Sequence, residues 1–337
     1  MDQRNNQHGT QHGTHHTDHF NQHRTRLLGI AYRMLGTRAD AEDVLQDAYL
    51  RWHEAAPPDN LEAWLVTVVT RLCIDRLRKA KVERAAYVGP WLPEPLIATA
   101  ADTRSPEWLL EFASDVSTAF LLVLERLGAE ERAAFLLHDV FDVDYAELAR
   151  MLGKSAASCR QLVHRARGRV RQPASAPALP PKFTVSPEMH MQLLQKFMAA
   201  SKTGDRGQLA ALFSADATFT GDGGGKVASV LNVLHGADRI ARLLHVIARN
   251  FGPRLTFQVV DINGQPGVLR YLDGQLDSVS SFVLEADDVV ENDAGDAVIK
   301  ARIKALYTVR NPDKLQGVDS YFIHVLIFSK TLSQTSS

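Results

Sequence analysis

The sequence is poor in cysteine and has no long hydrophobic run. Only Cys73 and Cys159 occur among its 337 residues, which argues against a disulfide framework or a cysteine-based zinc site and favours a reducing, cytoplasmic compartment. No stretch of about 18 apolar residues is present, so we expect no membrane-spanning helix. The N-terminus also lacks the apolar segment of a secretion signal. Charge is nearly balanced, with 38 Lys and Arg against 39 Asp and Glu, so only its distribution can indicate a partner.

Length and composition indicate a globular protein of two or three domains. At roughly 100–200 residues per domain, 337 residues are enough for this number, and 45% hydrophobic residues are enough for packed cores. Residues 1–23 differ, because they are polar and contain six histidines. We expect a disordered tail there, and another at residues 331–337. Metal binding by the histidines is the alternative, since several are three or four residues apart.

The segment 24–86 is predicted to be a helical domain. Over Arg38–Glu54, apolar residues recur at helical spacing and form one stripe, and the opposite face is acidic. The following helix, Leu61–Arg84, begins with apolar residues and ends with basic ones. Between them, Pro57–Asn60 ends the first helix and caps the second.

Two proline-rich segments, residues 87–105 and 173–187, are predicted linkers, because closely spaced prolines cannot share a helix. The first also holds apolar Trp91 and Leu92, so we expect part of it to dock on a domain surface. Residues 106–172 have a helical pattern, and residues 188–330 read as helices followed by strands, which is typical of an α+β domain. The helices are predicted at Met189–Ala200, Gly207–Phe213 and Ala237–Asn250, and the strands at Leu255–Ile262, Val268–Leu272, Val279–Leu284, Ala297–Val309 and Tyr321–Phe328.

A helix-turn-helix pattern ends the segment 106–172. Asp144 caps one predicted helix, Gly153 ends it, and Ser155 caps a last helix that ends near Arg171. From residue 148 to 172, seven residues are basic and none is acidic, a local charge that suits the phosphates of DNA. A solvated basic face is the alternative. The outward residues of the last helix, suited to base edges and phosphates, are Ser158, Arg160, Gln161, His164, Arg165 and Arg167.

These segments together resemble an extracytoplasmic-function sigma factor, the smallest type of the bacterial σ70 family. The resemblance implies that the helix-turn-helix is σ4, which reads the −35 promoter element through the outward residues just named. It implies that the acidic helix belongs to σ2 and docks on core RNA polymerase, at the β and β′ subunits. The docking residues would be Asp40, Glu42, Asp43, Gln46 and Asp47.

The same resemblance assigns the opening and reading of the −10 element to the second helix of σ2 and the loop before it. Flipped bases and a single strand need aromatic and cationic side chains to hold them. For Asn60, a role as helix cap is an equally good interpretation. The residues implied are Asn60, Trp64, Arg71, Arg76, Arg78, Lys79 and Lys81.

Three short motifs are similar to those of one group of these sigma factors, which carries a fused SnoaL-like C-terminal domain. They are Trp91-Leu92-Pro93-Glu94-Pro95-Leu96, Asp222-Gly223-Gly224-Gly225-Lys226 and Asn311-Pro312-Asp313-Lys314-Leu315. The resemblance covers nearly all of residues 24–330. It implies two all-α sigma domains and a cone-shaped α+β domain that regulates them by packing on them or on their linker. The contact residues implied are Trp91, Leu92, Pro93, Glu94, Asp222, Gly223, Gly224, Gly225, Lys226, Asn311, Asp313 and Lys314.

The glycine run does not have the spacing of a phosphate-binding loop. Thr220 stands where the first glycine should be, and Val227 stands where Ser or Thr should be. A contact loop or a plain turn fits better. SnoaL-like domains have an apolar pocket, and some relatives use a pocket carboxylate as a base. The candidates here would be Asp216, Asp222 or His235, but no second catalytic group stands at a telling spacing, so we expect neither an enzyme nor a cofactor.

We therefore predict a promoter-specificity subunit of RNA polymerase with a regulatory C-terminal domain. One alternative is a one-component regulator that binds duplex DNA by its helix-turn-helix and a small ligand in the C-terminal pocket. Another is a pocket enzyme fused to a DNA-binding domain. The acidic helix and the basic tail of its neighbour favour the first hypothesis, because neither alternative needs them.

Overall fold

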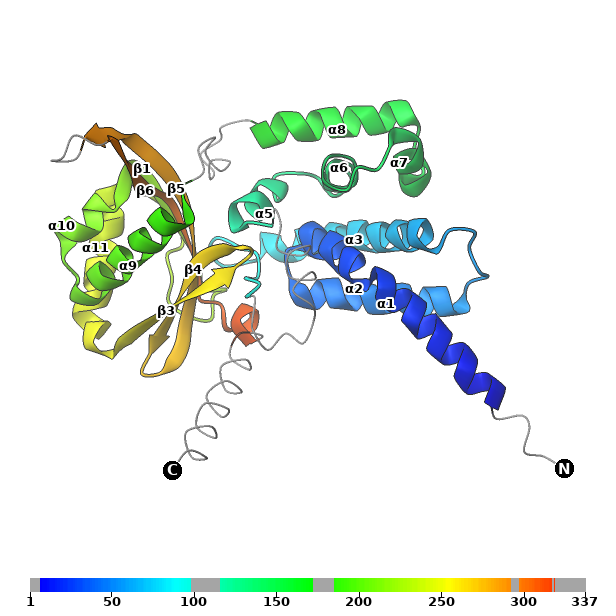
Figure 1. Ribbon diagram of the computed structural model, residues 1–337, viewed down its shortest axis with the longest axis horizontal. Helices are drawn as coiled ribbons and strands as arrows, with labels where there is room; N and C mark the ends of the chain where they lie inside the picture. Colours follow the sequence, from blue (N-terminus) through cyan, green and yellow to red (C-terminus); the bar gives the residue numbers. More distant parts are fainter. Residues whose placement is uncertain (1–6, 98–115, 172–184, 292–296, 317, 319–337) are drawn as a thin grey trace. The chain divides into compact units, whose positions relative to one another are not determined.

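The computed structural model describes residues 7–97, 116–171, 185–291, 297–316 and 318. They form two compact units (Figure 1). The helical unit contains residues 7–85 and 123–171, and the sheet unit contains residues 86–97, 116–122 and the described residues from 185 onward. Within the described part of the chain, every helix is too short or too polar to cross a membrane.

The helical unit begins with three helices, α1 (Gln7–Leu35), α2 (Arg38–Glu54) and α3 (Leu61–Ala85). The predicted apolar stripe of α2 is buried, and both later helices lie where the periodicity places them. The first helix differs from prediction, because it starts inside the segment expected to be a disordered tail. Phe20 gives a physical reason: its ring is buried against Tyr49 and Trp52 of α2, at centroid distances of 5.2 and 6.2 Å. Tertiary packing stabilises helix that propensity alone does not.

Most of α5 (Thr118–Leu124) belongs to the sheet unit. The second half of the helical unit follows it, with α6 (Ala129–Phe135), a π-helical turn (Leu136–Val140), α7 (Tyr145–Leu152) and α8 (Ala156–Arg171). Within the segment 106–172, whose pattern is helical, α5 ends at Leu124, and residues 106–115 lie outside the described part of the chain. The helix-turn-helix is confirmed. Its caps are as predicted.

Those caps define the turn between α7 and α8. Asp144 accepts hydrogen bonds from the amides of Ala146 and Glu147, both at 2.8 Å, and these bonds lower the pKa of its carboxyl group. Gly153 has the left-handed conformation that ends a helix, with φ of 64°. Ser155 accepts from the amide of Ser158 at 3.1 Å. The angle between the two helices is therefore set by local hydrogen bonds as well as by the core.

The sheet unit combines three helices, α9 (Pro187–Thr203), α10 (Arg206–Ala211) and α11 (Ala237–Phe251), with a six-stranded sheet. Its strand order is β2-β1-β6-β5-β4-β3, and only the β1–β6 pair is parallel among the pairs described. The α+β prediction is confirmed. The strands are β1 (Phe213–Asp222), β2 (Leu234–His235), β3 (Leu255–Ile262), β4 (Gln265–Leu272), β5 (Gln275–Glu291) and β6 (Ala297–Val309).

Strand β1 is absent from the prediction, which extends a helix to Phe213 instead. Alanine, threonine and aspartate fill much of this strand, so its alternation of buried and exposed residues is weak in hydropathy terms. It is a strand because β6 offers it a partner along Thr218–Asp222. The predicted strand Tyr321–Phe328 lies outside the described residues.

Both faces of the sheet are apolar. Helices α9, α10 and α11 pack on one face (Figure 1), where Phe282 and Leu306 belong to their core. On the other face, Val283 and Tyr307 pack with Leu92 of the linker, Ala119 and Leu315. An antiparallel sheet normally leaves one face to solvent. Here Leu92 of the linker helps to bury the second face of the sheet, so the linker is part of the hydrophobic core of this unit.

Candidate nucleic-acid interface and linker site

The last helix of the helix-turn-helix, α8, presents the predicted set of polar residues to solvent. Its buried side chains are Cys159, Leu162, Val163 and Ala166. Burial raises the pKa of the Cys159 thiol, as expected for a core residue with no reactive role. The residues on the exposed side are Ser158, Arg160, Gln161, His164, Arg165 and Arg167.

Two carboxylates outside α8 neutralise part of its basic face. Glu131 of α6 accepts from Arg165 Nε at 3.1 Å and also pairs with Arg169. Asp139 holds Arg167 through two bonds of 2.8 and 2.7 Å. These acids precede the basic window in the sequence, so a count along one helix does not find them. Arg160 instead lies over the ring of Tyr145, 5.4 Å from its centroid.

On α2 and α3, residues predicted for two different partners lie together. Arg76, predicted to bind DNA, donates to Asp40 at 3.0 Å and to Asp43 at 3.1 Å, two residues predicted to bind polymerase. The basic residue of α3 and the acidic residues of α2 therefore neutralise one another. Reasoning about each helix separately does not predict this pairing. Glu42 pairs with Arg38, and Gln46 and Asp47 are exposed.

The loop before α3 behaves as a cap. Asn60 is exposed, and its side-chain oxygen accepts from the amide of Ala63 at 3.0 Å. The capping interpretation of Asn60 is thus confirmed, and a role in base capture stays a prediction. Trp64, four residues further on, is half-buried.

The basic part of α3 contacts the helix-turn-helix within the helical unit. Arg71 Nε donates to the carbonyl of Met151 at 2.9 Å, and Arg71 Nη2 to that of Arg150 at 3.4 Å. Arg78 pairs with Glu130 of α6 at 2.9 Å. Lys79 and Lys81 are exposed. Two residues predicted to bind the −10 element are therefore engaged with the segment predicted to read the −35 element.

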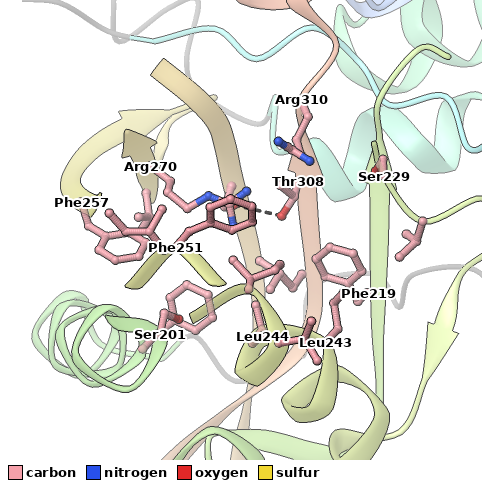
Figure 2. Close-up of a pocket in the computed structure, with 18 of the residues that line it drawn as sticks. Ser201, Phe219, Ser229, Leu243, Leu244, Phe251, Phe257, Arg270, Thr308 and Arg310 are labelled. Atoms are coloured by element: carbon pink, nitrogen blue, oxygen red, sulfur yellow. Dashed lines mark hydrogen bonds between the residues drawn. The ribbon is translucent and has the colours of Figure 1, made fainter. Parts of the chain in front are cut away.

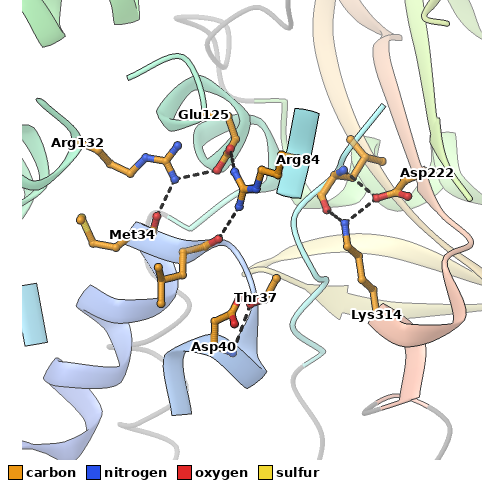
Figure 3. A network of polar contacts seen from close by, with 10 residues as sticks. Met34, Thr37, Asp40, Arg84, Glu125, Arg132, Asp222 and Lys314 are labelled. Atoms are coloured by element: carbon orange, nitrogen blue, oxygen red, sulfur yellow. Dashed lines mark hydrogen bonds and ion pairs between the residues drawn. The ribbon is translucent and has the colours of Figure 1, made fainter. Parts of the chain in front are cut away.

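A partly buried charge network joins the same two parts at the end of α1 (Figure 3). Arg132 donates to the carbonyl of Met34 at 2.6 Å and to Glu125 at 2.8 Å. Arg84 pairs with the same carboxylate and donates to the carbonyl of Leu35 at 3.0 Å. The last carbonyls of a helix have no intrahelical partner, so these two arginines complete α1 while Glu125 holds them.

In the sheet unit, one buried carboxylate holds the linker. Asp222, at the end of β1, is 0% exposed. It accepts from the hydroxyl of Tyr87 at 2.6 Å, the amide of Leu92 at 2.9 Å and the amide of Gly224 at 3.0 Å. It also pairs with Lys314 at 2.7 Å (Figure 3). We call Tyr87, Leu92, Asp222, Asn311 and Lys314 the linker site.

Lysine 314 is the counter-charge of this site and a second bond to the linker. Its Nζ donates to the carbonyl of Leu92 at 2.5 Å and lies 4.2 Å from the centroid of the Trp91 ring. Asn311 donates to the hydroxyl of Tyr87 at 2.9 Å. Burial, with the neighbouring Asp222, raises the pKa of Tyr87, so its hydroxyl remains a donor. The expected docking of Trp91 and Leu92 is thus realised on the sheet unit.

The linker continues along the edge of the sheet beyond this site. Pro93 is buried and Glu94 is half-buried. Leu96 exchanges two hydrogen bonds with Asn263, at 3.2 and 2.8 Å, and Ile97 forms an antiparallel bridge with Ile262 of the edge strand β3. The edge strand is therefore partly paired, which removes free backbone groups from it.

The glycine run is explained by close approach of the chain. A Cβ on Gly224 would lie 2.4 Å from Asn311 Nδ2, and one on Gly225 would lie 3.0 Å from Val88 Cβ in the linker. Both residues also have positive φ, 61° and 71°. Lys226 leaves the run to pair with exposed Asp313 at 2.6 Å. The run therefore lies against the linker at Val88.

The sheet unit also contains an apolar cavity of about 320 Å³. The residues suggested as a catalytic base lie elsewhere: Asp216 is exposed and pairs with Lys304, and His235 is exposed on β2. Asp222 is in the linker site. Among the described residues that line the cavity, none is Asp, Glu or His.

Comparison with known proteins identifies both parts of the helical unit. Residues 19–83 match the family model for Sigma-70 region 2, and residues 117–170 match that for Sigma-70, region 4. The chain is 38% identical over 301 residues to the ECF RNA polymerase sigma factor SigJ of Mycobacterium tuberculosis, covering 87% of this chain and 91% of the relative. It is 30% identical to the probable ECF sigma factor SigI of the same species, covering 80% and 89%.

The fold agrees with a solved relative. The crystal structure of Mycobacterium tuberculosis SigJ superposes with a TM-score of 0.66 at 32% identity, covering 89% of this chain and 98% of that one. Regions 2 and 4 define a class of transcription initiation factors that work with RNA polymerase and promoter DNA. The chain belongs to the extracytoplasmic-function sigma factors of that class. The one-component regulator is not supported, and nothing in the matches indicates catalysis.

The close approach at the glycine run gives a first prediction. Gly224→Ala should lower the free energy of unfolding of the sheet unit by about 3 kcal/mol, because strain from positive φ adds to overlap with Asn311. Gly274→Ala is the matched control: its φ is also positive, at 80°, but nothing lies within 4 Å of the added Cβ. It should cost about 1 kcal/mol. Urea denaturation measures both, and equal losses would contradict the contact.

Proposed function

We propose that this sigma factor is regulated by its sheet unit, which holds the linker between regions 2 and 4 and so limits how far the two regions can separate. The observation that carries the proposal is the linker site. Leu92 is 0% exposed, and both its backbone amide and its carbonyl are bound by side chains of the sheet unit. A passive tether would not need buried charges. Removing a carboxylate and a lysine from water is costly, and their pairing only offsets that cost.

Promoter geometry requires separation. By their names the −35 and −10 elements are about 25 base pairs apart, which is about 85 Å at about 3.4 Å per base pair of B-form DNA. In the helical unit, Arg71 of region 2 is bonded to the Met151 carbonyl in region 4. The two regions cannot reach both elements while this contact persists. The packed helical unit is therefore a resting form, and promoter recognition requires it to open.

Chain length sets how far the regions can move apart. The residues between region 2 and region 4, about 32 of them, can span at most about 110 Å when extended, and holding residues 87–97 on the sheet unit reduces this reach. The start of α5 is held as well, because Thr118 donates to Ser281 at 3.1 Å and Ala119 is buried against the sheet. Release of these two attachments lets regions 2 and 4 separate further. The held form is accordingly the less active one.

Region 4 reads the −35 element through α8. The exposed Arg160, Gln161 and His164 lie in the first turns after the cap, and a recognition helix uses this part for base edges. Arg165 and Arg167, further along, suit phosphates once Glu131 and Asp139 release them. Each of these arginines then has an anionic partner in both states, a carboxylate in the free protein and a phosphate on DNA.

Region 2 binds the β and β′ subunits of core polymerase through the acidic face of α2. Gln46 and Asp47 are exposed, and Asp43 is exposed beside Arg76. When Arg76 turns to the DNA strand near the −10 element, Asp40 and Asp43 are released for the polymerase. Exposed charges of this kind affect how region 2 is oriented on the polymerase and how fast the two associate, more than how tightly they bind.

The reader helix gives the second prediction. Replacing Arg160 and Arg165 by alanine together should abolish promoter-dependent run-off transcription, because a base-edge and a phosphate contact are lost, and binding to core polymerase should persist. The control is the double variant Arg206→Ala, Arg242→Ala, which removes two exposed arginines of the sheet unit. Undiminished transcription by the α8 variant would contradict the assignment.

The third prediction concerns the linker site. Tyr87→Phe removes a hydroxyl bonded to a buried carboxylate, worth roughly 1.5–3 kcal/mol, and should shift the balance from held to released linker about tenfold or more. Run-off transcription at limiting sigma factor should therefore rise. Tyr271→Phe is the matched control, since it removes an exposed hydroxyl of the same unit whose bond to Gln258 is long, at 3.4 Å. An unchanged or lower rate for Tyr87→Phe would refute regulation by holding the linker.

A further inference from the structure

The cavity of the sheet unit is apolar over most of its wall. It lies between α9, α11 and the sheet, and its volume of about 320 Å³ is at the lower end of ligand-binding pockets. Figure 2 shows Leu243 and Leu244 on the side away from the arginines. The main apolar lining residues are Phe197, Phe219, Leu244, Phe251, Phe257 and Leu306. A wall of this kind takes a hydrophobic body, such as one or two rings.

The opposite end of the cavity is polar and cationic. Arg270 and Arg310 both line it, together with Thr308 (Figure 2). Asp277 accepts from Arg270 at 2.5 Å and from Arg310 at 2.5 Å, so one carboxylate serves two guanidinium groups. The side chains of Arg270 and Asp277 are only 13% and 11% exposed. This cluster has a net charge of +1 and is largely desolvated.

One donor in this cluster lacks a partner. Arg310 Nε is buried and has no hydrogen-bond acceptor among the described residues, although its two other nitrogens bind Asp277 and the carbonyl of Ala228. Ser201 also lines the cavity, and its Oγ is buried with no hydrogen-bond partner among the residues that the structure describes. Buried donors of this kind are uncommon, and an acceptor that completes them is favoured.

We propose that the cavity is a binding site for a small apolar monocarboxylate, with the carboxylate at Arg270 and Arg310 and the hydrophobic body toward α9 and α11. One negative charge balances the net charge of the cluster, and a carboxylate accepts short, charge-assisted hydrogen bonds from guanidinium N–H groups such as the unpartnered Arg310 Nε. The described lining offers no carboxylate or imidazole to act as a base, so the site binds its ligand without converting it.

This site stands on the cavity and does not rest on the regulatory role of the linker. The cavity nevertheless borders the linker site in sequence, because its residue Arg310 directly precedes Asn311 of that site. The backbone amides of Arg310 and Asn311 both donate to the carbonyl of Asp222. The binding measurement below is made on the free sigma factor, without polymerase. Its outcome is therefore separate from that of the transcription experiments.

The test is calorimetric titration of the full chain with 2-naphthoate and with its neutral isostere 2-naphthamide. The wild type should bind naphthoate at least tenfold more tightly than naphthamide. Arg310→Gln should weaken naphthoate at least tenfold and leave naphthamide unchanged, which also shows that the cavity is intact. Arg206→Gln, an equal loss of charge at the surface of the same unit, should change neither.

Two results would overturn the proposal. One is equal affinity of the wild type for the acid and the amide, which would make the cavity a purely apolar site. The other is no detectable binding of naphthoate at millimolar concentration. If Arg310→Gln does not fold, Arg310→Lys takes its place, and a naphthoate affinity equal to that of the wild type would overturn the contact with Arg310 Nε, which lysine lacks.

Discussion

The attachment of the linker to the sheet unit depends on one buried ion pair, Asp222 with Lys314. A buried carboxylate is tolerable only when its oxygens are satisfied, and Asp222 has four donors, two of which come from the linker. Loss of the linker would leave this charge short of two partners inside the protein, which costs more than the bonds themselves are worth. The pair therefore favours the held linker.

The linker residue bound by Asp222, Leu92, also packs on the sheet, so the proposed regulation and the packing of the sheet involve the same residue. A sheet with two apolar faces requires two covers, and the linker at Leu92 with Ala119 of α5 contributes to the second. Regions 2 and 4 meanwhile bind each other through Arg71 and through the Glu125 network. In the proposed mechanism, opening for DNA breaks polar contacts in both units. Such a balance can be shifted by a few kcal/mol.

Much of the fold follows from the sequence because it is recorded in local signals. The stripe of α2, the caps at Asp144 and Gly153, and the Asn263-Gly264 and Asp273-Gly274 turns, whose residues all have positive φ, act within a few residues. Strand β1 and the early start of α1 depend on distant partners and were not predictable. The motifs around Leu92, Asp222 and Lys314 indicate a contact. Only the structure shows that one carboxylate unites them, and that Asp40 shares Arg76 with Asp43.

Hydrogen exchange at a single amide tests the central claim most directly. The Leu92 amide is bonded to Asp222, so its exchange reports whether the linker is held. The account predicts strong protection of this amide in the free sigma factor and loss of that protection in a complex with core polymerase and promoter DNA. Fast exchange in the free chain, or equal protection in the promoter complex, would contradict it.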